Sequence, residues 1–231
     1  DLSGNQFLGD PVNPDFTGVQ TLARVIPLAE NLVAVDVSGN KLGPKGARLL
    51  ASTMKFSASL TELNIAENDL EKDGAVAVAK ALEVNASLTK LNIAWNNLGK
   101  DGAVAFSEAL NVNASMKIID LSSNGIRSEG AVAVAEALKS STSSLTSINL
   151  SSCELGYDTK ANKDMAGVQA IAEALNVNTS LTSLNLHFNQ IGSEGAFALA
   201  EALHINVSLK TIKLSNNRLD AKSTIALSKA L

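Results

Sequence analysis

Cysteine and histidine are scarce in this 231-residue sequence, which contains one cysteine, Cys153, and two histidines, His187 and His204. With one thiol the chain can form no internal disulfide and no cysteine-rich metal centre, which argues against a disulfide-stabilised secreted module. Neither histidine pairs with a serine or cysteine in a triad or nucleophile-elbow pattern. The sequence therefore predicts a protein that is not an enzyme, with Cys153 as a small buried residue.

Motifs for phosphate and metal binding are missing as well. No G-x-x-x-x-G-K-[ST] sequence occurs, so the glycines of the chain are assigned to turns rather than to a phosphate cradle. The acidic segment with Asp10, Asn13 and Asp15 does not have the spacing of an EF-hand and is interrupted by two prolines. We expect a solvated loop there, and no cofactor or metal ion.

Aromatic residues make up only 3% of the chain, and no stretch approaches the 18 or more apolar residues of a membrane span. The net charge is −4, and the lysines and arginines are mixed among the acidic residues rather than gathered in a basic stripe. These features predict no membrane and no nucleic-acid partner. Together with the single cysteine they indicate a cytoplasmic protein whose narrow interior is filled by alanine and leucine.

The dominant feature that is present is a repeat of 28 residues. The segment Ser59 to Ala86 returns in nearly the same form as Ser87 to Ala114. A period of this size is typical of a solenoid, in which each unit buries its apolar face against its neighbours. With a partial unit at the start, about eight units are expected, whose first leucine or its equivalent stands at Leu32, Leu60, Leu88, Met116, Leu145, Leu181 and Leu209.

Two irregularities interrupt the period. Eight extra residues, close to Tyr157–Asp164, lengthen the sixth unit, and seven extra residues lie between Phe7 and Gly18 in the first. Residues 1–231 are expected to form a single domain. Because the sequence starts within a strand motif and stops near a helix end, neither carrying a polar cap, we expect a fragment of a longer array with weak self-association through its ends.

Within a unit, the apolar positions change period. Leu60, Leu63 and Ile65 alternate as in a short strand, whereas Val78, Ala79 and Leu82 follow at helical spacing. A glycine such as Gly74 is expected to open each helix and to allow close packing against the strand layer. Only the last unit lacks this glycine and has Ser223 instead, so we expect this unit to fray.

An asparagine stands at the ninth position of the units, where the chain turns out of the strand. Its amide can bond backbone groups that the turn leaves unpaired, which predicts a ladder from coil to coil. The same position holds Cys153 in the sixth unit and asparagine in the others, namely Asn5, Asn40, Asn68, Asn96, Asn124, Asn189 and Asn217. Four further asparagines in N-x-S sequons share one phase of the repeat, which favours duplication over glycosylation, namely Asn85, Asn113, Asn178 and Asn206; a fifth, Asn149, lies in a strand.

These motifs carry a resemblance to a known family. Units with L-x-x-L-x-L-x-x-N/C-x-L followed by G-x-x-x-L/V-A-x-A-L resemble the ribonuclease-inhibitor-type leucine-rich repeats, which also occur in NOD-like receptors and Ran GTPase-activating proteins. The resemblance covers nearly the whole chain. It implies an α/β horseshoe with a parallel β-sheet on the concave face and α-helices on the convex face.

Positions between the inward leucines are expected to face the concave surface. A first column contains Asn92 and Asp120, and a second contains His187. The third column, nearer the rim, runs through Gly4, Gly39, Glu67, Trp95, Ser123, Ser152, Phe188 and Asn216. Packing gives no reason for the two rings in it, and an exposed tryptophan is typical of a binding hot spot.

The sequence thus predicts a module that binds a protein partner through the concave face and one loop rim. The partner-binding residues expected are Trp95, Phe188, Glu67, Asn92, Asp120, His187 and, in the extra loop as a competing site, Tyr157. Two alternatives remain open, a GTPase-activating protein of the Ran type and the sensor domain of a NOD-like receptor. The resemblance implies, for the first, a contribution from a loop residue at the slot held by Gln6, Lys41, Asp69, Asn97, Gly125, Glu154, Gln190 and Arg218.

Overall fold

A computed structural model of the protein describes residues 1–8, 14–140 and 144–231. Asp10 and Asn13 of the acidic loop segment lie outside the described residues. Strand and helix alternate along the chain, as the change of period predicts. The strands form one parallel sheet in chain order, with the bounds β1 Ala34–Asp36, β2 Glu62–Asn64, β3 Lys90–Asn92, β4 Ile118–Asp120, β5 Ser147–Asn149, β6 Ser183–Asn185 and β7 Thr211–Lys213.

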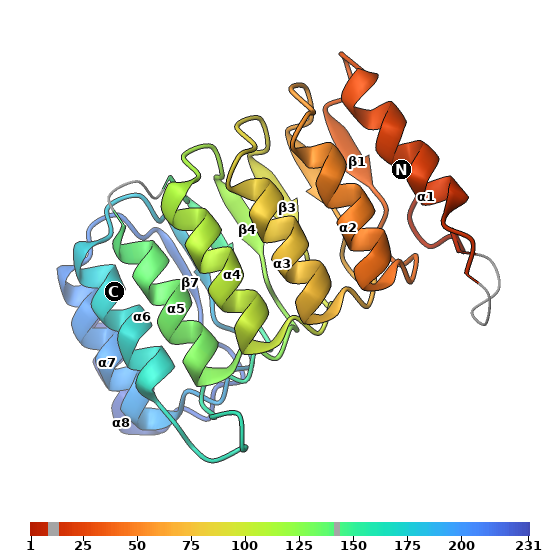
Figure 1. Cartoon of the computed structure of the whole chain (residues 1–231). Helices are drawn as coiled ribbons and strands as arrows, with labels where there is room; N and C mark the ends of the chain where they lie inside the picture. Colours follow the sequence, from red (N-terminus) through yellow and green to blue (C-terminus); the bar gives the residue numbers. More distant parts are fainter. Residues whose placement is uncertain (9–13, 141–143) are drawn as a thin grey trace.

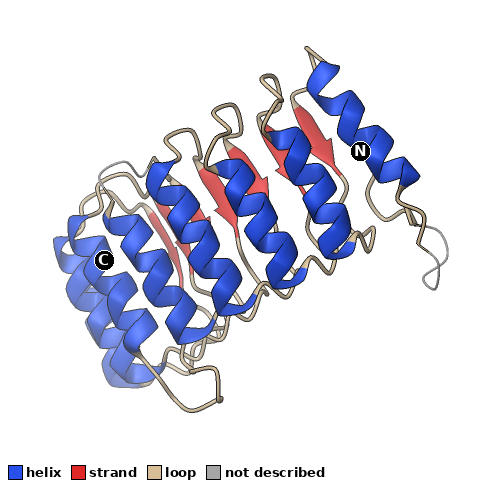
Figure 2. Cartoon of the chain, viewed as in Figure 1, coloured by secondary structure: helices blue, strands red, loops and turns tan. Residues whose placement is uncertain are grey.

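Helices form the second layer and cover the outer side of the sheet (Figures 1 and 2). The array curves so that the sheet lines its inner face, which confirms the expected α/β solenoid. Eight α-helices are seen in the described residues, one for each expected unit. They are α1 Thr17–Val25, α2 Gly43–Met54, α3 Glu71–Leu82, α4 Gly99–Val112, α5 Arg127–Lys139, α6 Ala166–Val177, α7 Gly192–Ile205 and α8 Ala221–Ala230, with a short 3-10 helix η1 at Ile26–Leu28.

The register of the sheet follows the sequence period. Leu63 of β2 lies beside Leu91 of β3, which is 28 residues further along the chain. Each strand has only three residues, and its central side chain points into the core while its neighbours face the inner surface. The first unit forms no strand within the described residues. It is attached to the array by a hydrogen bond from the backbone N–H of Leu2 to the carbonyl of Asp36 at 2.8 Å.

The core is a continuous layer between sheet and helices. Leu63 and Ile65 enter it from the sheet side, and Val78 and Leu82 enter it from α3. Each of these side chains is at most 4% exposed, and full burial of such a side chain stabilises the fold by about 1.5–3 kcal/mol. Because every unit contributes the same set, the core has no centre, and each coil depends on its two neighbours.

Contrary to the expectation, five of the seven repeated glycines are the fourth residue of their helix rather than its start, whereas Gly18 and Gly167 are the second residue of α1 and α6. Gly102 is the fourth residue of α4 and faces the preceding helix. A Cβ placed on it would lie 3.0 Å from the Cβ of Ala75 in α3 and 2.7 Å from that of Leu98. The glycine is therefore needed for close approach between helices, because a larger residue would push neighbouring coils apart.

Ser223, which replaces this glycine in the last unit, has its own structural role. It is fully buried and forms a capping box with Asp220 at the start of α8. The Asp220 carboxylate accepts hydrogen bonds from the Ser223 backbone N–H at 2.8 Å and from its hydroxyl at 2.7 Å. The serine thus stabilises the start of this helix, which removes one reason for expecting the last unit to fray.

The asparagine ladder is present from Asn40 onward. The Nδ2 group of Asn96 donates to the carbonyls of Ile65, Ile93 and Ala94, and so joins two coils. Asn5 is different, because it is exposed and, among the described residues, its side chain donates to carbonyls of its own turn, those of Leu2 and Ser3. Within the part of the chain that the structure describes, the Oδ1 atom of Asn40, which would continue the ladder toward Asn5, has no partner.

The sequon asparagines form a second ladder at the opposite edge of the array. Asn113 is 5% exposed, and its Nδ2 donates to the carbonyls of Leu82 and Asn85 at 2.7 Å each. Its Oδ1 accepts from the backbone N–H of Met116 at 2.8 Å. These nitrogens are occupied inside the fold, so duplication of a structural residue accounts for the four sequons.

Cys153 fills its place in the first ladder as a buried thiol. Its backbone N–H donates to the Oδ1 of Asn189 at 2.9 Å, and its sulfur contacts the carbonyl of Leu121 at 3.3 Å. Burial raises the pKa of this thiol to about 12, although the backbone N–H groups of Asn124 and Ser123 act in the opposite direction. A thiol so far from ionising is a poor nucleophile, which agrees with a structural role.

Candidate functional site

The turns from strand to helix share an unusual backbone. Residues on both sides of the ladder asparagine are left-handed, with φ of 57° at Trp95 and 55° at Asn97, and φ of 55° at Phe188 and 58° at Gln190. The alternation brings the asparagine inside and leaves its two neighbours on the rim. A bulky residue rarely adopts this conformation, which glycine adopts without strain, and Gly4 and Gly39 hold the same slot in the first two units.

A first hollow, which we call the Trp95 hollow, lies on this rim. Its volume is about 580 Å³. Trp95 is 63% exposed at one side of it, and Thr159 of the extra loop borders the other side. The remaining lining comes from the turns of three units, namely Asn97, Gly99, Lys100, Ser123, Asn124, Gly125, Arg127, Ser152 and Glu154.

The extra loop is fixed to the fifth unit by Arg127. The Nη1 atom of Arg127 donates to the carbonyls of Thr159 at 2.7 Å and of Asp158 at 3.3 Å. Its Nε atom forms an ion pair with Glu154 at 3.0 Å. In Figure 1 the loop before α6 extends beyond the ends of the helices. It is thus a structured wall of the rim rather than a free appendage.

Two carboxylates give the loop further order. Asp158 accepts from the backbone N–H groups of Lys160 and Asn162, and hydrogen bonds from Asn162 hold its pKa below the usual range. Glu129 in α5 accepts from the hydroxyl of Thr159 at 3.0 Å. Burial acts to raise the pKa of Glu129, but hydrogen bonds from its own backbone and from Thr159 outweigh this effect and lower it.

A second hollow, the Phe188 hollow, adjoins the first and has a volume of about 470 Å³. Phe188 is 55% exposed beside it, and the Tyr157 hydroxyl donates to Oε1 of Gln190 at 2.9 Å. Its other lining residues are Ser152, Glu154, Ala161 and Arg218. Ser152 and Glu154 line both hollows, so the two form one surface from Trp95 to Phe188, which we call the rim surface.

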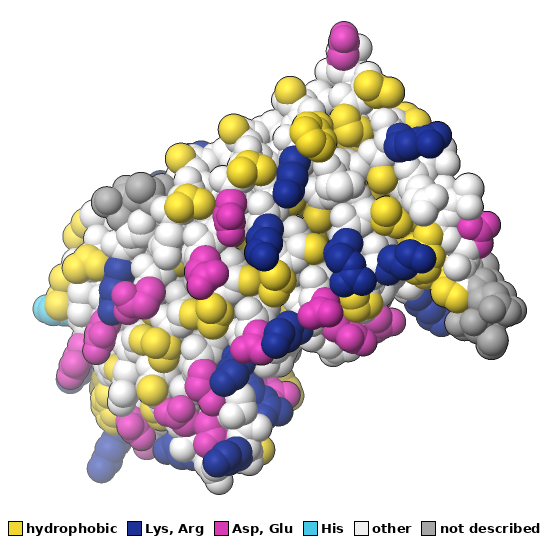
Figure 3. All heavy atoms as spheres, in the orientation of Figure 1, with side chains coloured by type: hydrophobic (Ala, Val, Ile, Leu, Met, Phe, Trp, Pro, Cys, Tyr) yellow, Lys and Arg dark blue, Asp and Glu magenta, His cyan; other side chains and the backbone are white. Residues whose placement is uncertain are grey.

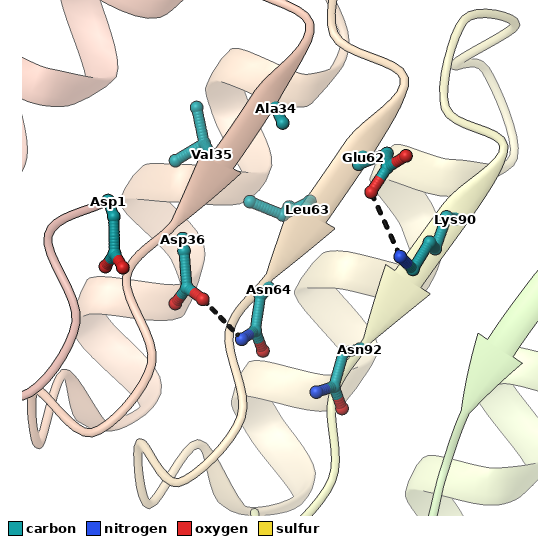
Figure 4. Close-up of a pocket in the computed structure, with 9 residues that line it drawn as sticks. All are labelled: Asp1, Ala34, Val35, Asp36, Glu62, Leu63, Asn64, Lys90 and Asn92. Carbon is teal, nitrogen blue, oxygen red and sulfur yellow. Dashed lines mark hydrogen bonds and ion pairs between the residues drawn. The ribbon is translucent and has the colours of Figure 1, made fainter.

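A third hollow, of about 340 Å³, lies on the inner face of the sheet at β1 to β3 (Figure 4). Asp36 and Asn64 point toward one another there, and the Nδ2 of Asn64 donates to the carboxylate at 2.7 Å. Lys90 and Glu62 form an ion pair at 3.1 Å across neighbouring strands. These polar groups largely satisfy one another, so this hollow offers few free groups to a ligand.

One column of the inner face was missed at the sequence level. Glu62 and Lys90 precede the inward leucine of their strands, whereas the predicted columns begin after it. Ile118 stands in the same column and is 41% exposed. Strand alternation alone would have placed these residues beside Asn64 and Asn92, because residues two apart in a strand share a face.

The structure brings only some of the expected partner-binding residues together. Trp95, Phe188 and Tyr157 share the rim surface, so the rings and the extra loop are parts of one continuous surface. Asn92 lines the third hollow instead. Glu67, Asp120 and His187 line none of these three hollows; the carboxylate of Asp120 accepts from Ser122 and Asn149, and Nδ1 of His187 lies 2.7 Å from the Ser215 hydroxyl.

The helix face differs from the rim surface. In the view of Figure 3, acidic, basic and apolar side chains alternate over the helices. No helix within the described ranges is long and apolar enough to cross a membrane. The described residues also hold no group of three histidine, cysteine, aspartate or glutamate side chains that could bind a metal ion.

Comparison with known proteins agrees with this geometry. The family described as leucine rich repeat matches residues 29–51, 56–79, 84–107, 112–135 and 177–200, which make up just over half of the chain. No curated protein matches the sequence.

Two solved structures share the fold. Actin-binding site 2 of leiomodin-1 has a TM-score of 0.51 and 15% identity, over 81% of this chain and 86% of that one. The leucine-rich repeat-containing protein LegL7 of Legionella pneumophila has a TM-score of 0.50 and 19% identity, over 92% of this chain and 75% of that one. At such identities the likeness concerns the fold alone.

Proposed function

Since this chain belongs to the leucine-rich repeat family, we propose that it is a non-catalytic interaction module that binds a protein partner through the rim surface and the adjoining inner face of the sheet. The observation that carries this proposal is the pair of exposed rings, Trp95 and Phe188. Aromatic anchors contribute much of the binding energy at protein interfaces, especially when they stand beside hollows that exclude water.

The backbone of the turn does not explain why rings stand at these two positions. A left-handed backbone costs an ordinary residue about 1–2 kcal/mol, and a glycine would avoid this cost. Trp95 and Phe188 nevertheless occupy left-handed positions, with side chains outside the core. The same left-handed backbone occurs at this slot in other units, at Glu67, Ser123, Ser152 and Asn216, so the turn itself does not call for a ring. The exposure of the two rings at a position that would suit glycine supports a role in binding.

The subfamily and the cellular location are part of the same proposal. A period of 28 residues with one α-helix in every unit supports the ribonuclease-inhibitor type. Two features support a cytoplasmic location. The single thiol can form no internal disulfide, and the side-chain nitrogens of the four sequon asparagines that share one repeat phase donate to backbone carbonyls inside the fold.

The test compares proteins captured from an extract of the source cells by immobilised wild-type chain and by two variants. Trp95→Gly removes a ring at a position where glycine relieves strain, so the fold is expected to remain intact. Asn216→Gly is the matched control, because Asn216 holds the same slot with φ of 58° but lines neither hollow of the rim surface.

The proposal requires partners that are retained by the wild type and by Asn216→Gly but lost by Trp95→Gly. If all three chains capture the same proteins in the same amounts, the rim surface is not the binding site. Circular dichroism and urea unfolding of each variant ensure that lost capture does not reflect unfolding.

A further inference from the structure

We propose that the partner presents an extended, acidic segment of chain, with two apolar side chains four residues apart that cover Trp95 and Phe188. This inference rests on the proposed function and adds the chemistry of the partner. It follows from three features of the rim surface, namely the spacing of the rings, the hydrogen-bonding groups beside them, and the charge of the lining residues.

The spacing of the rings fits an extended segment. Trp95 follows β3 and Phe188 follows β6, three strands further along the sheet. Neighbouring strands lie about 4.8 Å apart, so the two slots are separated by roughly 14 Å. An extended chain advances about 3.3 Å per residue, which puts residues i and i+4 about 13 Å apart and on the same face.

Neutral polar side chains line the two hollows beside the rings. Asn97, Ser123 and Ser152 line the Trp95 hollow, and Ser152 and Gln190 line the Phe188 hollow. An extended segment exposes backbone N–H and C=O groups that need partners once water is excluded, and amides and hydroxyls can both donate and accept. In a helix the backbone N–H and C=O groups bond to one another, so a helical segment would offer few backbone groups to these side chains.

The charge of the rim surface favours an acidic segment. Its lining contains three cations, Lys100, Arg127 and Arg218, and one carboxylate, Glu154, in a chain whose net charge is −4. Arg127 and Glu154 neutralise each other at 3.0 Å. The local excess of positive charge therefore comes from the other two cations.

Lys100 and Arg218 are both exposed, and among the described residues neither makes an ion pair. The carboxylate of Asp101, next to Lys100, is taken by Lys72 at 2.9 Å. Within the described part of the chain, Arg218 makes a long contact of 3.5 Å with the Tyr157 hydroxyl. Each hollow thus offers one ring and one cation that makes no ion pair with the described residues, although the charge of Lys100 also acts on the nearby carboxylates of Asp101 and Glu129. An apolar side chain and a nearby carboxylate would complement such a hollow.

The test uses a phage-displayed library of linear 12-residue peptides selected on the wild-type chain. Peptides that also bind the double variant Trp95→Gly/Phe188→Gly are removed, so that the survivors require the rings. We expect a consensus in which two apolar residues are separated by three others and accompanied by Asp or Glu.

Fluorescence anisotropy then measures the affinity of the consensus peptide. Lys100→Gln and Arg218→Gln are each expected to weaken binding about fivefold, as for an exposed charge pair. Lys80→Gln on α3 is the matched control and is expected to change nothing, because Lys80 lies on the helix side. Raising the salt concentration should weaken the peptide as well.

The possible results separate the two proposals. A ring-dependent consensus that is basic, or that has apolar residues at helical spacing, would overturn the acidic extended segment while leaving the rim surface as the binding site. Affinity unchanged by both Lys100→Gln and Arg218→Gln would also overturn it. If no peptide distinguishes the wild type from the double variant, the inference is wrong, whereas the proposed function is decided separately by the capture of whole proteins.

Discussion

The backbone N–H of Asn68 donates to the Oδ1 of Asn96 at 3.0 Å, across the full length of one repeat. The same oxygen accepts from the backbone N–H of Leu70 at 3.3 Å, and the Nδ2 of Asn96 donates to three carbonyls. One buried amide therefore satisfies backbone groups of two neighbouring coils. Neighbouring coils therefore stabilise one another through these hydrogen bonds as well as through contacts in the core.

Replacing Asn96 by alanine is expected to destabilise the protein by about 1–3 kcal/mol, because buried backbone groups would lose their partners. Lys80→Ala, an exposed change on α3, should have almost no effect. Urea unfolding followed by circular dichroism measures both variants. Equal unfolding midpoints would show that the ladder contributes nothing to stability.

Gly102→Ala gives a second test of the packing between coils. In an ordinary helix interior this change stabilises by about 1 kcal/mol. Here the added Cβ would lie 2.7 Å from the Cβ of Leu98 and 3.0 Å from that of Ala75, so we expect a lower melting temperature. Val104→Ala, at a position 38% exposed on the same helix, is the control. A gain in stability from Gly102→Ala would contradict the close approach of α3 and α4.

Cys153→Asn is expected to stabilise the protein by about 1 kcal/mol, since an amide makes stronger hydrogen bonds to the turn than a thiol does. The backbone N–H of Asn124 faces the sulfur and would gain an amide oxygen as acceptor. Urea unfolding under reducing conditions measures the change. In the wild type, the same burial should keep the thiol unreactive toward a thiol reagent until the chain unfolds; rapid labelling of the native protein would count against this placement.

Much of the fold could be predicted because each structural position recurs in several units with the same or a similar residue. The inward leucines and the ladder asparagines recur at the same phase, and each burial follows from the period. The first residue of each helix could not be predicted from the period, because it depends on the left-handed residues of the turn rather than on the spacing of apolar residues. Glu71, for example, has φ of 54° and begins α3 three residues before Gly74.

The candidate site was predictable only in part. Trp95 and Phe188 stood out because they break a column of small residues. Their connection to the extra loop depends on Arg127, which bonds Thr159 more than 30 positions away. The insertion occurs in one unit only, so the period carries no information about how it folds. The positions of Lys100 and Arg218 beside the rings could not be predicted either. Basic and acidic residues are mixed along the sequence, and which of them lie beside the rings depends on the conformation of the turns.

Acid is expected to destabilise the fold. Burial acts to raise the pKa of Asp36, but hydrogen bonds from Ser38 and Asn64 outweigh it, so the pKa of this carboxyl is lowered; that of Asp220 is lowered chiefly by the Ser223 backbone N–H. A lowered pKa in the folded state means that the stabilisation is present above the unfolded value, near pH 4, and is lost as the pH falls through the folded value.

Urea midpoints measured between pH 7 and pH 2.5 should therefore fall in the acid range. Asp36→Asn should flatten this dependence, because asparagine keeps an oxygen for Ser38 but cannot be protonated in this range. A pH profile of Asp36→Asn that runs parallel to that of the wild type would show that this carboxylate has no part in the acid sensitivity.

Trp95→Gly is expected to raise the free energy of unfolding by up to about 1 kcal/mol, although it deletes the largest side chain on the rim. The backbone at Trp95 has φ of 57°, which strains an ordinary residue and suits glycine, while the ring is 63% exposed and contributes little to the core. The added chain entropy of glycine in the unfolded state offsets part of the gain.

Trp95→Ala separates the two contributions. It removes the ring but keeps a Cβ at the strained position, so it should be less stable than Trp95→Gly. Thermal unfolding of the three proteins, with Phe188→Gly and Phe188→Ala as a parallel pair, measures the order. If glycine proves less stable than alanine at both positions, the rings are not held at a cost in backbone strain, and strain gives no support to a binding role for them. A more stable Trp95→Gly that captures no partner would show that this residue serves binding rather than folding.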